Sequence, residues 1–334
     1  MKERIEYIDL AKGICILLVV LDHISDSGYF RGGNYPLNDI FEQTRMPLYF
    51  ILSGLFFKDY PGGIREFLLR KTNRILVPYL FFMLLYRVAG RLLLLLTGFN
   101  AGPAWLPLWF LLCLFWMNVI FATLYYIIKK LVPSGPAAET ALALCVFATG
   151  IGGYLAGNLP LSTGTAMTSL PFLWMGYLLS RKLNFFGLRL HRALALSAAI
   201  GLFAVLHFLY CGDNYFYLNT YQTPLPLVYL SGLLGTLAIL LLSRSIGWLP
   251  VVSYVGRFSI IVLCTHVAVV KGVVGTLTLI PQFGAGVGTV QSLLVLTLTA
   301  VCCMGLCRLL SRYLPWFTAQ KDLFRPQKAT GKQK

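Results

Sequence analysis

Residues 10–24 read LAKGICILLVVLDHI, and this stretch gives the clearest indication of the fold class. It runs without a charge from Gly13 to Leu21, and charged side chains stand at both of its ends. Similar apolar runs recur along the whole chain, and several approach the roughly 20 residues that a helix needs to cross a bilayer. Only 12% of the residues are charged, against roughly 25% in an ordinary soluble chain. The sequence therefore predicts an all-α integral membrane protein, because lipid offers the backbone no hydrogen-bond partners.

We expect a bundle of about ten transmembrane helices, separated by short segments rich in Gly and Pro. Their predicted ranges are 10–24, 40–57, 75–97, 106–128, 140–156, 166–180, 193–211, 225–242, 254–270 and 289–313. No segment between them is long enough for a soluble domain. Residues 1–315 are therefore predicted to form one polytopic membrane domain, followed by a disordered basic tail, residues 316–334, in the cytoplasm near anionic lipid.

The net charge of +16 is not gathered into one patch. The Lys and Arg residues mark the gaps between apolar runs, so we interpret the charge as a topology signal and expect no nucleic-acid partner. With the N-terminus in the cytoplasm, the outer segments carry only Arg31, Arg45 and Lys271, and most of the 28 basic residues lie inside. The positive-inside rule then predicts that both termini are cytoplasmic. The eight cysteines lack the spacing of metal ligands, and we expect no metal.

Charged side chains are expensive inside a bilayer, so those of the first span are candidates for function. The eleven steps from Lys12 to His23 make three helical turns plus about 20°, which puts both on one face about 16 Å apart. Asp9 lies on that face as well, and Asp26 would orient the imidazole if the helix continued that far. An alternative needs no chemistry: Lys12 extends to the inner interface, and His23 is a polar helix end at the outer one.

The second span contains RMPLYFILSG, residues 45–54. Arg45 opens this segment, and Ser53 and Gly54 close it. Small residues in this position allow the close approach of a ligand, or of a neighbouring helix in a simple packing face.

Basic residues gather in the inner segment after the second span. Arg70 and Arg74 lie four residues apart, so their guanidiniums share a helical face suited to capture of a phosphate, with Lys71 beside them. Positive-inside anchoring explains the same charges without a ligand, and both alternatives stay open.

Further polar residues lie within the predicted spans. Arg87 and Arg91 are too deep to be simple anchors and need a carboxylate, a carbonyl or an aqueous cavity. Trp109 is either a site residue or part of the aromatic belt. For His207 and His266 we favour a structural role.

Several of these motifs occur together in an order and spacing that resembles a known family. They are Arg4-x4-Asp9-x2-Lys12-Gly13-x9-His23, Pro47-Leu-Tyr-Phe-Ile-Leu-Ser-Gly54, Lys71-x2-Arg74-Ile-x2-Pro78 and Leu108-Trp109-Phe110-Leu111. By these motifs the chain is identified as a member of acyltransferase family 3, the membrane O-acyltransferases. Within that family it is similar to the fucose 4-O-acetylase-like branch. The resemblance is clearest over residues 1–115.

The resemblance implies a ten-helix membrane domain that takes acetyl-CoA from the cytoplasm and acetylates carbohydrate hydroxyls, often in surface polysaccharides. It implies a multi-pass protein of a bacterial-type inner (plasma) membrane, whose partners are acetyl-CoA, a carbohydrate acceptor and the lipid bilayer. Taken with the residues singled out above, the resemblance leads us to predict three sets: catalytic His23, Lys12 and Asp9; acetyl-CoA-binding Arg70, Lys71 and Arg74; and substrate or charge-stabilising Arg45, Ser53, Arg87, Arg91 and Trp109. Lys12 stands where relatives have Arg, and Arg45 where they commonly have His.

We therefore expect a membrane-bound O-acetyltransferase in which His23 is the general base on the acceptor hydroxyl. Lys12 or Arg91 would stabilise the developing negative charge. A covalent acetyl-histidine relay is an open variant. The alternative from another class is a transporter or exporter of a polar solute or glycan precursor, and a membrane racemase or sensor component is a third.

Overall fold

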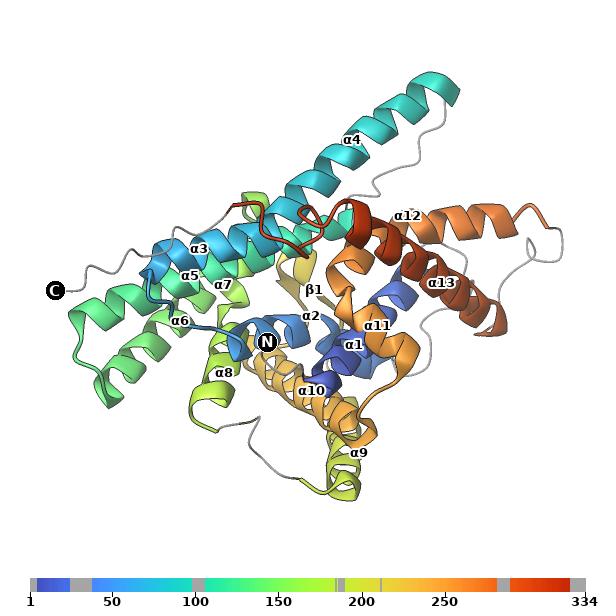
Figure 1. Cartoon of the computed structure of the whole chain (residues 1–334). Helices are drawn as coiled ribbons and strands as arrows, with labels where there is room; N and C mark the ends of the chain where they lie inside the picture. Colours follow the sequence, from blue (N-terminus) through green and yellow to red (C-terminus); the bar gives the residue numbers. More distant parts are fainter. Residues whose placement is uncertain are drawn as a thin grey trace.

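The protein is almost entirely helical in its computed structural model, which describes residues 5–24, 38–97, 106–183, 185, 190–210, 212–280 and 289–324 (Figure 1). The α-helices are α1 (Glu6–Ile24), α2 (Asn38–Leu55), α3 (Gly63–Lys71), α4 (Val77–Thr97), α5 (Trp109–Leu131), α6 (Pro136–Ala156), α7 (Thr163–Thr168), α8 (Leu170–Arg181), α9 (Arg192–Phe208), α10 (Leu225–Ile246), α11 (Pro250–Arg257), α12 (Ser259–Leu277) and α13 (Thr289–Tyr313). Short turns are η2 (Thr72–Leu76), η3 (Leu106–Leu108), η4 (Pro160–Ser162) and η6 (Phe216–Leu218), and an antiparallel pair is made by β1 (Asn214–Tyr215) and β2 (Thr220–Tyr221). Arg4 and Asp26, named above, lie outside the described residues.

Each predicted span coincides with helix, and two of them are broken. The range 166–180 covers parts of α7 and α8, which meet at Ser169, and the range 254–270 covers parts of α11 and α12, which meet at Phe258. Within the described residues, six helical stretches are long and apolar enough to cross a membrane: Gly63–Leu96, Leu106–Leu131, Pro136–Ala156, Leu225–Ile246, Ser259–Leu277 and Gln291–Tyr313. The helical membrane character is thus confirmed, whereas the count of about ten spans and the cytoplasmic termini stay predictions.

The most highly charged long helices lie inside the bundle. In α1 and α2 every window of 18 residues contains at least three acidic or basic residues, so neither helix is among the six apolar stretches. Helix α1 packs against α2, α10, α11, α12 and α13, so its charged residues Asp9, Lys12 and Asp22 are partly covered by protein (Figure 1). Lipid penalises exposed charge, and an interior position avoids that penalty while bringing the charges together.

Two close crossings hold these charged helices in place. A Cβ atom on Gly256 of α11 would lie 1.9 Å from the carbonyl oxygen of Asp9 in α1. A Cβ atom on Gly54 of α2 would lie 1.8 Å from the carbonyl oxygen of Leu173 in α8. Glycine is therefore required at both crossings, because no side chain fits between backbones this close. Gly54 therefore lies in a helix-packing face, which is one of the two alternatives predicted for it.

A single helical run leads from α3 through η2 into α4. The turn η2 is a π-helix, a type of insertion that is often found at functional sites. Beyond it, α4 extends away from the other helices, and its side chains are largely exposed (Figure 1). Arg87 and Arg91 are both exposed on this helix.

The chain turns back after α13, and residues 314–324 lie against the π-helix η2. Phe317 stacks on Phe81 of α4 with 4.7 Å between ring centroids, and Thr318 is fully buried. Residues 325–334 lie outside the described part of the chain. We call residues 314–324 the C-terminal strap.

Candidate functional site

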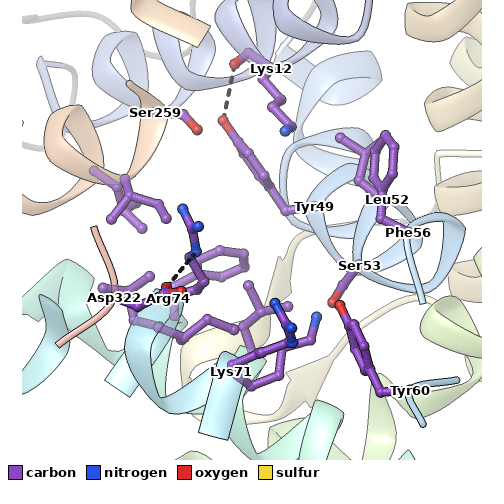
Figure 2. Close-up of a pocket in the computed structure, with 17 residues that line it drawn as sticks. Lys12, Tyr49, Leu52, Ser53, Phe56, Tyr60, Lys71, Arg74, Ser259 and Asp322 are labelled. Atoms are coloured by element: carbon purple, nitrogen blue, oxygen red, sulfur yellow. Dashed lines mark hydrogen bonds and ion pairs between the residues drawn. The ribbon is translucent and has the colours of Figure 1, made fainter. Parts of the chain in front are cut away.

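A cavity of about 360 Å³ lies where α1, α2, α3, η2, α5, α12 and the C-terminal strap meet (Figure 2). Its polar wall is formed by Lys12, Tyr49, Ser53, Tyr60, Arg70, Lys71, Arg74, Ser259 and Asp322. Its apolar wall is formed by Leu52, Phe56, Ile75, Phe110, Leu111, Leu114, Ile260 and Leu263. One end is therefore strongly basic, and the remainder is an apolar passage with a few hydroxyl groups.

The first cation of the basic end, Arg70, is held by its own helix. Its Nε and Nη2 atoms donate to Oε1 of Glu66, one turn earlier, at 3.0 and 2.6 Å. The guanidinium also lies over the ring of Tyr60, 4.7 Å from its centroid. Lys71 lies over Phe67 with 5.3 Å between Nζ and the ring centroid. These contacts keep the cations oriented without removing them from the cavity wall.

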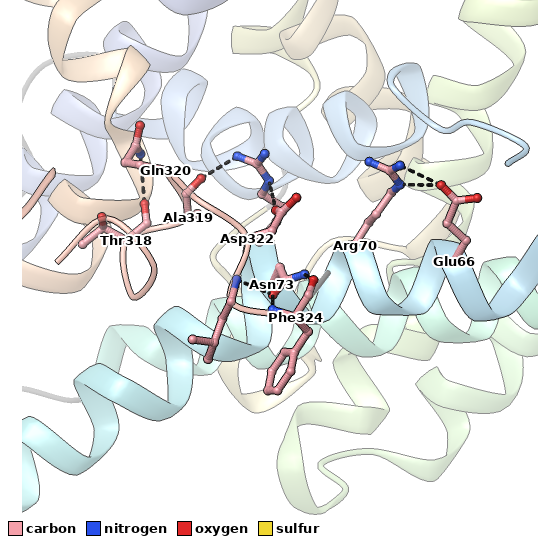
Figure 3. Close-up of polar contacts among 10 residues, drawn as sticks. Glu66, Arg70, Asn73, Thr318, Ala319, Gln320, Asp322 and Phe324 are labelled. Carbon is pink, nitrogen blue, oxygen red and sulfur yellow. Dashed lines mark hydrogen bonds and ion pairs between the residues drawn. The ribbon is translucent and has the colours of Figure 1, made fainter. Parts of the chain in front are cut away.

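The second guanidinium, Arg74, is held by the C-terminal strap (Figure 3). Its Nη1 donates to the carbonyl oxygen of Ala319 at 2.5 Å, and its Nε lies 3.5 Å from Oδ1 of Asp322. The neighbouring Asn73, fully buried, donates from Nδ2 to the carbonyl of Phe324 at 2.7 Å and accepts at Oδ1 from the amides of Leu323 and Phe324. One side chain thus fastens the end of the strap to η2.

Polar groups also line the passage between the basic end and the interior of the bundle. The hydroxyl of Tyr49 donates to the backbone oxygen of Lys12 at 3.0 Å, which ties α2 to α1 (Figure 2). Ser53 and Asn118 exchange hydrogen bonds of 3.1 and 2.9 Å between α2 and α5. The Lys12 ammonium lies 5.7 Å from the centroid of Phe56.

His23 lies three turns beyond Lys12 on α1, and it is not among the residues that line the cavity. It is half-buried, and its Nδ1 lies 2.9 Å from the carbonyl oxygen of Val19. Its ring meets that of His266 edge to face, with 4.9 Å between centroids and an interplanar angle of 87°. His266 follows the cavity-lining Leu263 by one turn of α12, so the histidine pair is next to the apolar end of the cavity.

An ion pair stands beside the histidines. Nη1 of Arg45 in α2 lies 2.6 Å from Oδ1 of Asp22, the residue before His23. Arg45 is 5% exposed, so this charge is held inside the protein and is compensated there.

The structure brings together only some of the residues predicted for the site. Lys12, Ser53, Arg70, Lys71 and Arg74 line the cavity, whereas the other described candidates do not. Those others are Asp9 and His23 on α1, Arg45 on α2, Arg87 and Arg91 on α4, and Trp109, which begins α5 edge-on to Phe110. Their roles stay predictions.

Four residues near the cavity escaped the sequence analysis as site candidates. Tyr49 was available inside the Pro47–Gly54 motif, and Ser259 and His266 are seven residues apart, which places them on one face of α12. No sequence pattern around Asp322 indicates that it belongs to the cavity, because its position depends on how the C-terminal strap folds.

Among the described residues, His, Cys, Asp and Glu form no group of three that could hold a metal ion. The expectation of metal-free chemistry stays a prediction.

The fold and the cavity define a multi-pass membrane protein with a basic cavity at the junction of its charged helices. A family model described as an acyltransferase domain matches residues 5–311. The chain belongs to acyltransferase family 3, and the predicted family is confirmed; the fucose 4-O-acetylase-like branch stays a prediction. Searches of curated proteins and of solved structures found no match.

Proposed function

We propose that the protein transfers an acetyl group from acetyl-CoA to a carbohydrate hydroxyl, in a surface polysaccharide or its precursor, at a bacterial-type inner membrane. Membership of the family supports acyl transfer in general. The observation that carries the proposal is the joint arrangement of the basic cavity and the histidine pair next to its apolar end.

The donor fits the cavity by charge and by shape. Coenzyme A carries phosphates at one end, and Arg70, Lys71 and Arg74 offer three cations at the basic end. Guanidinium groups bind phosphate through parallel hydrogen bonds, so Arg70 and Arg74 would anchor the nucleotide. The pantetheine arm would then extend along the apolar wall, between Leu52 and Leu263, toward the histidines.

The hydrogen bond of His23 supports a role as general base. A carbonyl oxygen only accepts hydrogen bonds, so the contact with Val19 places the proton of the neutral ring on Nδ1. Nε2 of His23 is therefore the atom with a free lone pair. It would take the proton of the acceptor hydroxyl while that oxygen bonds to the acetyl carbon, and the proton would then pass to the departing thiolate.

Distance assigns Lys12 to the donor rather than to the reacting carbonyl. Eleven helical residues separate it from His23, about 16 Å along the axis. Lys12 lines the cavity, so we place its ammonium against the donor between the phosphates and the thioester.

The test is incubation of the purified protein in lipid nanodiscs with labelled acetyl-CoA and a panel of sugars and glycan precursors. Wild type is expected to label an acceptor, and His23→Ala to lose this activity by at least about 100-fold. His207→Ala, an exposed histidine of α9, serves as the matched control and should retain it. Full activity of His23→Ala would rule out the mechanism. Solute flux without consumption of acetyl-CoA would instead favour a transporter.

A second experiment separates direct transfer from the acetyl-histidine relay. The protein is incubated with labelled acetyl-CoA without any acceptor, then quenched and analysed by peptide mass spectrometry. A labelled peptide containing His23 indicates the relay, whereas unlabelled protein with full transfer activity indicates direct transfer.

A further inference from the structure

His266 combines complete burial with an unsatisfied polar atom. Its side chain is 0% exposed in α12, and its Nε2 has no hydrogen-bond partner among the described residues. Buried polar atoms are nearly always paired, so an unpaired one in a native structure needs an explanation. The imidazole ring of His266 meets the ring of His23 edge to face.

The other nitrogen of His266 fixes both the orientation of the ring and its tautomer. Nδ1 lies 3.0 Å from the carbonyl oxygen of Val262 and 2.9 Å from that of Leu263, and both oxygens can only accept. The proton of the neutral ring is therefore on Nδ1, and Nε2 is an acceptor held in place without a donor. A residue that only packs in the core would need neither the acceptor atom Nε2 nor the two hydrogen-bond contacts of Nδ1.

His23 acquires a positive charge when it takes a proton, and that charge needs support. The adjacent carboxylate of Asp22 is already engaged by Arg45 at 2.6 Å. Asp26, the other acid close in sequence, lies outside the described residues. His266 meets the ring of His23 at 4.9 Å between centroids and carries the free acceptor atom.

We propose that His266 is a positioning residue for His23, and that its Nε2 lone pair supports the imidazolium form of His23 during acetyl transfer. This inference rests on the proposed function. The acceptor hydroxyl gives its proton to Nε2 of His23 as the oxygen bonds to the acetyl carbon. The carbon–sulfur bond breaks, and the thiolate leaves with its electron pair and takes the proton from His23. His266 stays neutral throughout, gives no atom to the product, and acts only through His23.

The kinetic test compares His266→Phe with His266→Gln. Phenylalanine keeps an aromatic ring but has no acceptor, so we expect kcat to fall by about 10- to 100-fold, less than the roughly 100- to 10,000-fold that a general base itself contributes. The KM for acetyl-CoA should stay within about twofold, because His266 is outside the donor cavity. Glutamine retains an acceptor oxygen and is expected to recover at least part of the lost kcat.

His207→Phe is the matched control, because His207 is exposed on α9 and the same change removes an imidazole elsewhere. Thermal unfolding of each variant in detergent identifies loss of fold. If His266→Phe does not fold, His266→Gln and His266→Ala are compared instead. The Gln variant keeps an acceptor atom and the Ala variant does not. A folded Gln variant with the wild-type kcat, together with a folded Ala variant of lower kcat, supports the need for an acceptor. A folded Phe or Ala variant with the wild-type kcat overturns the proposal.

A second readout does not depend on acetyl transfer. Diethyl pyrocarbonate modifies the neutral imidazole, and peptide mass spectrometry reports the rate at His23. Removing His266 should disfavour the charged form of His23 and raise this rate at mildly acidic pH, whereas His207→Phe should leave it unchanged. An unchanged rate in His266→Phe overturns the inference. If wild type transfers no acetyl group, the proposed function fails, and this rate still reports whether the two histidines are coupled.

Discussion

The guanidinium of Arg74 and the carboxylate of Asp322 form an ion pair, with 3.5 Å between Nε and Oδ1, although they lie far apart in the sequence. Both side chains line the basic cavity, where Asp322 is the one carboxylate among the lining residues that the structure describes. An anionic donor that binds Arg74 would meet this carboxylate as a competitor. The C-terminal strap thus supplies an internal counter-ion to the cations of the cavity, which we propose as the donor site.

Asp322→Asn is expected to strengthen donor binding. The substitution keeps the size of the side chain and removes the charge that competes for Arg74. Because the side chain of Arg74 is 53% exposed, solvent weakens the pair. We therefore expect the KM for acetyl-CoA to fall by only about two- to fivefold, with kcat nearly unchanged. Steady-state kinetics over a range of acetyl-CoA concentrations measure both constants.

Asp59→Asn is the matched control for this change. Asp59 is paired with Lys129 and does not line the cavity. Burial alone would raise the pKa of Asp59, but hydrogen bonds from Lys129 and Tyr126 outweigh it and hold the pKa below its ordinary value, so this acid is charged at neutral pH too. An Asp322→Asn variant whose KM rises would show that the carboxylate assists donor binding instead.

Arg74→Ala is expected to raise the KM for acetyl-CoA by about 10- to 100-fold, the value of one lost charge-assisted hydrogen bond to phosphate. The diagnostic comparison is acetyl-pantetheine, which has the thioester and the arm but lacks the nucleotide phosphates. With that donor, wild type and Arg74→Ala should have the same KM within about twofold. Lys130→Ala, which removes an exposed cation outside the cavity, should alter neither value. Equal losses with both donors would contradict a phosphate-binding role.

Much of the fold was predictable because its signals are local. Apolar runs of span length predict helices, and every predicted range contains one. Helical phase and the basic cluster also anticipated Lys12, Arg70 and Arg74, which meet in one cavity. The breaks at Ser169 and Phe258 were missed, since hydropathy continues across them and only the local backbone changes direction.

The remainder of the cavity could not be predicted, because it depends on contacts between distant segments. Asp322 is a single acid in a basic tail, and no spacing links it to Arg74. Its position follows from the hydrogen bonds of Asn73 and from the stacking of Phe317 on Phe81. The broad class of the protein can therefore be predicted from the sequence, whereas the balance of charge in the basic cavity depends on the tertiary structure.

Gly256→Ala is expected to destabilise the protein and disturb the site. The added Cβ would lie 1.9 Å from the carbonyl oxygen of Asp9 and 2.4 Å from the amide nitrogen of Gly13, and neither backbone atom can rotate away. Helix α1 must then move from α11, at a cost of about 1–3 kcal/mol or more. Thermal unfolding in detergent measures the loss. Gly152→Ala, whose Cβ would meet nothing within 4 Å, is the control and should unfold like wild type.

Asn73→Ala is expected to release the C-terminal strap and to mimic Asp322→Asn. The change removes one hydrogen bond to the carbonyl of Phe324 and two from the amides of Leu323 and Phe324. Trypsin should then cleave after Lys321 faster than in wild type or in Asn158→Ala, an exposed asparagine remote from the strap. The KM for acetyl-CoA should fall, because a loosened strap no longer presents Asp322 to Arg74.

If both changes act through the same contact, the double variant Asn73→Ala/Asp322→Asn should lower the KM no further than the stronger single variant does. Additive effects of the two substitutions would mean that Asn73 and Asp322 influence donor binding independently, and that the strap does not carry the counter-ion as a unit.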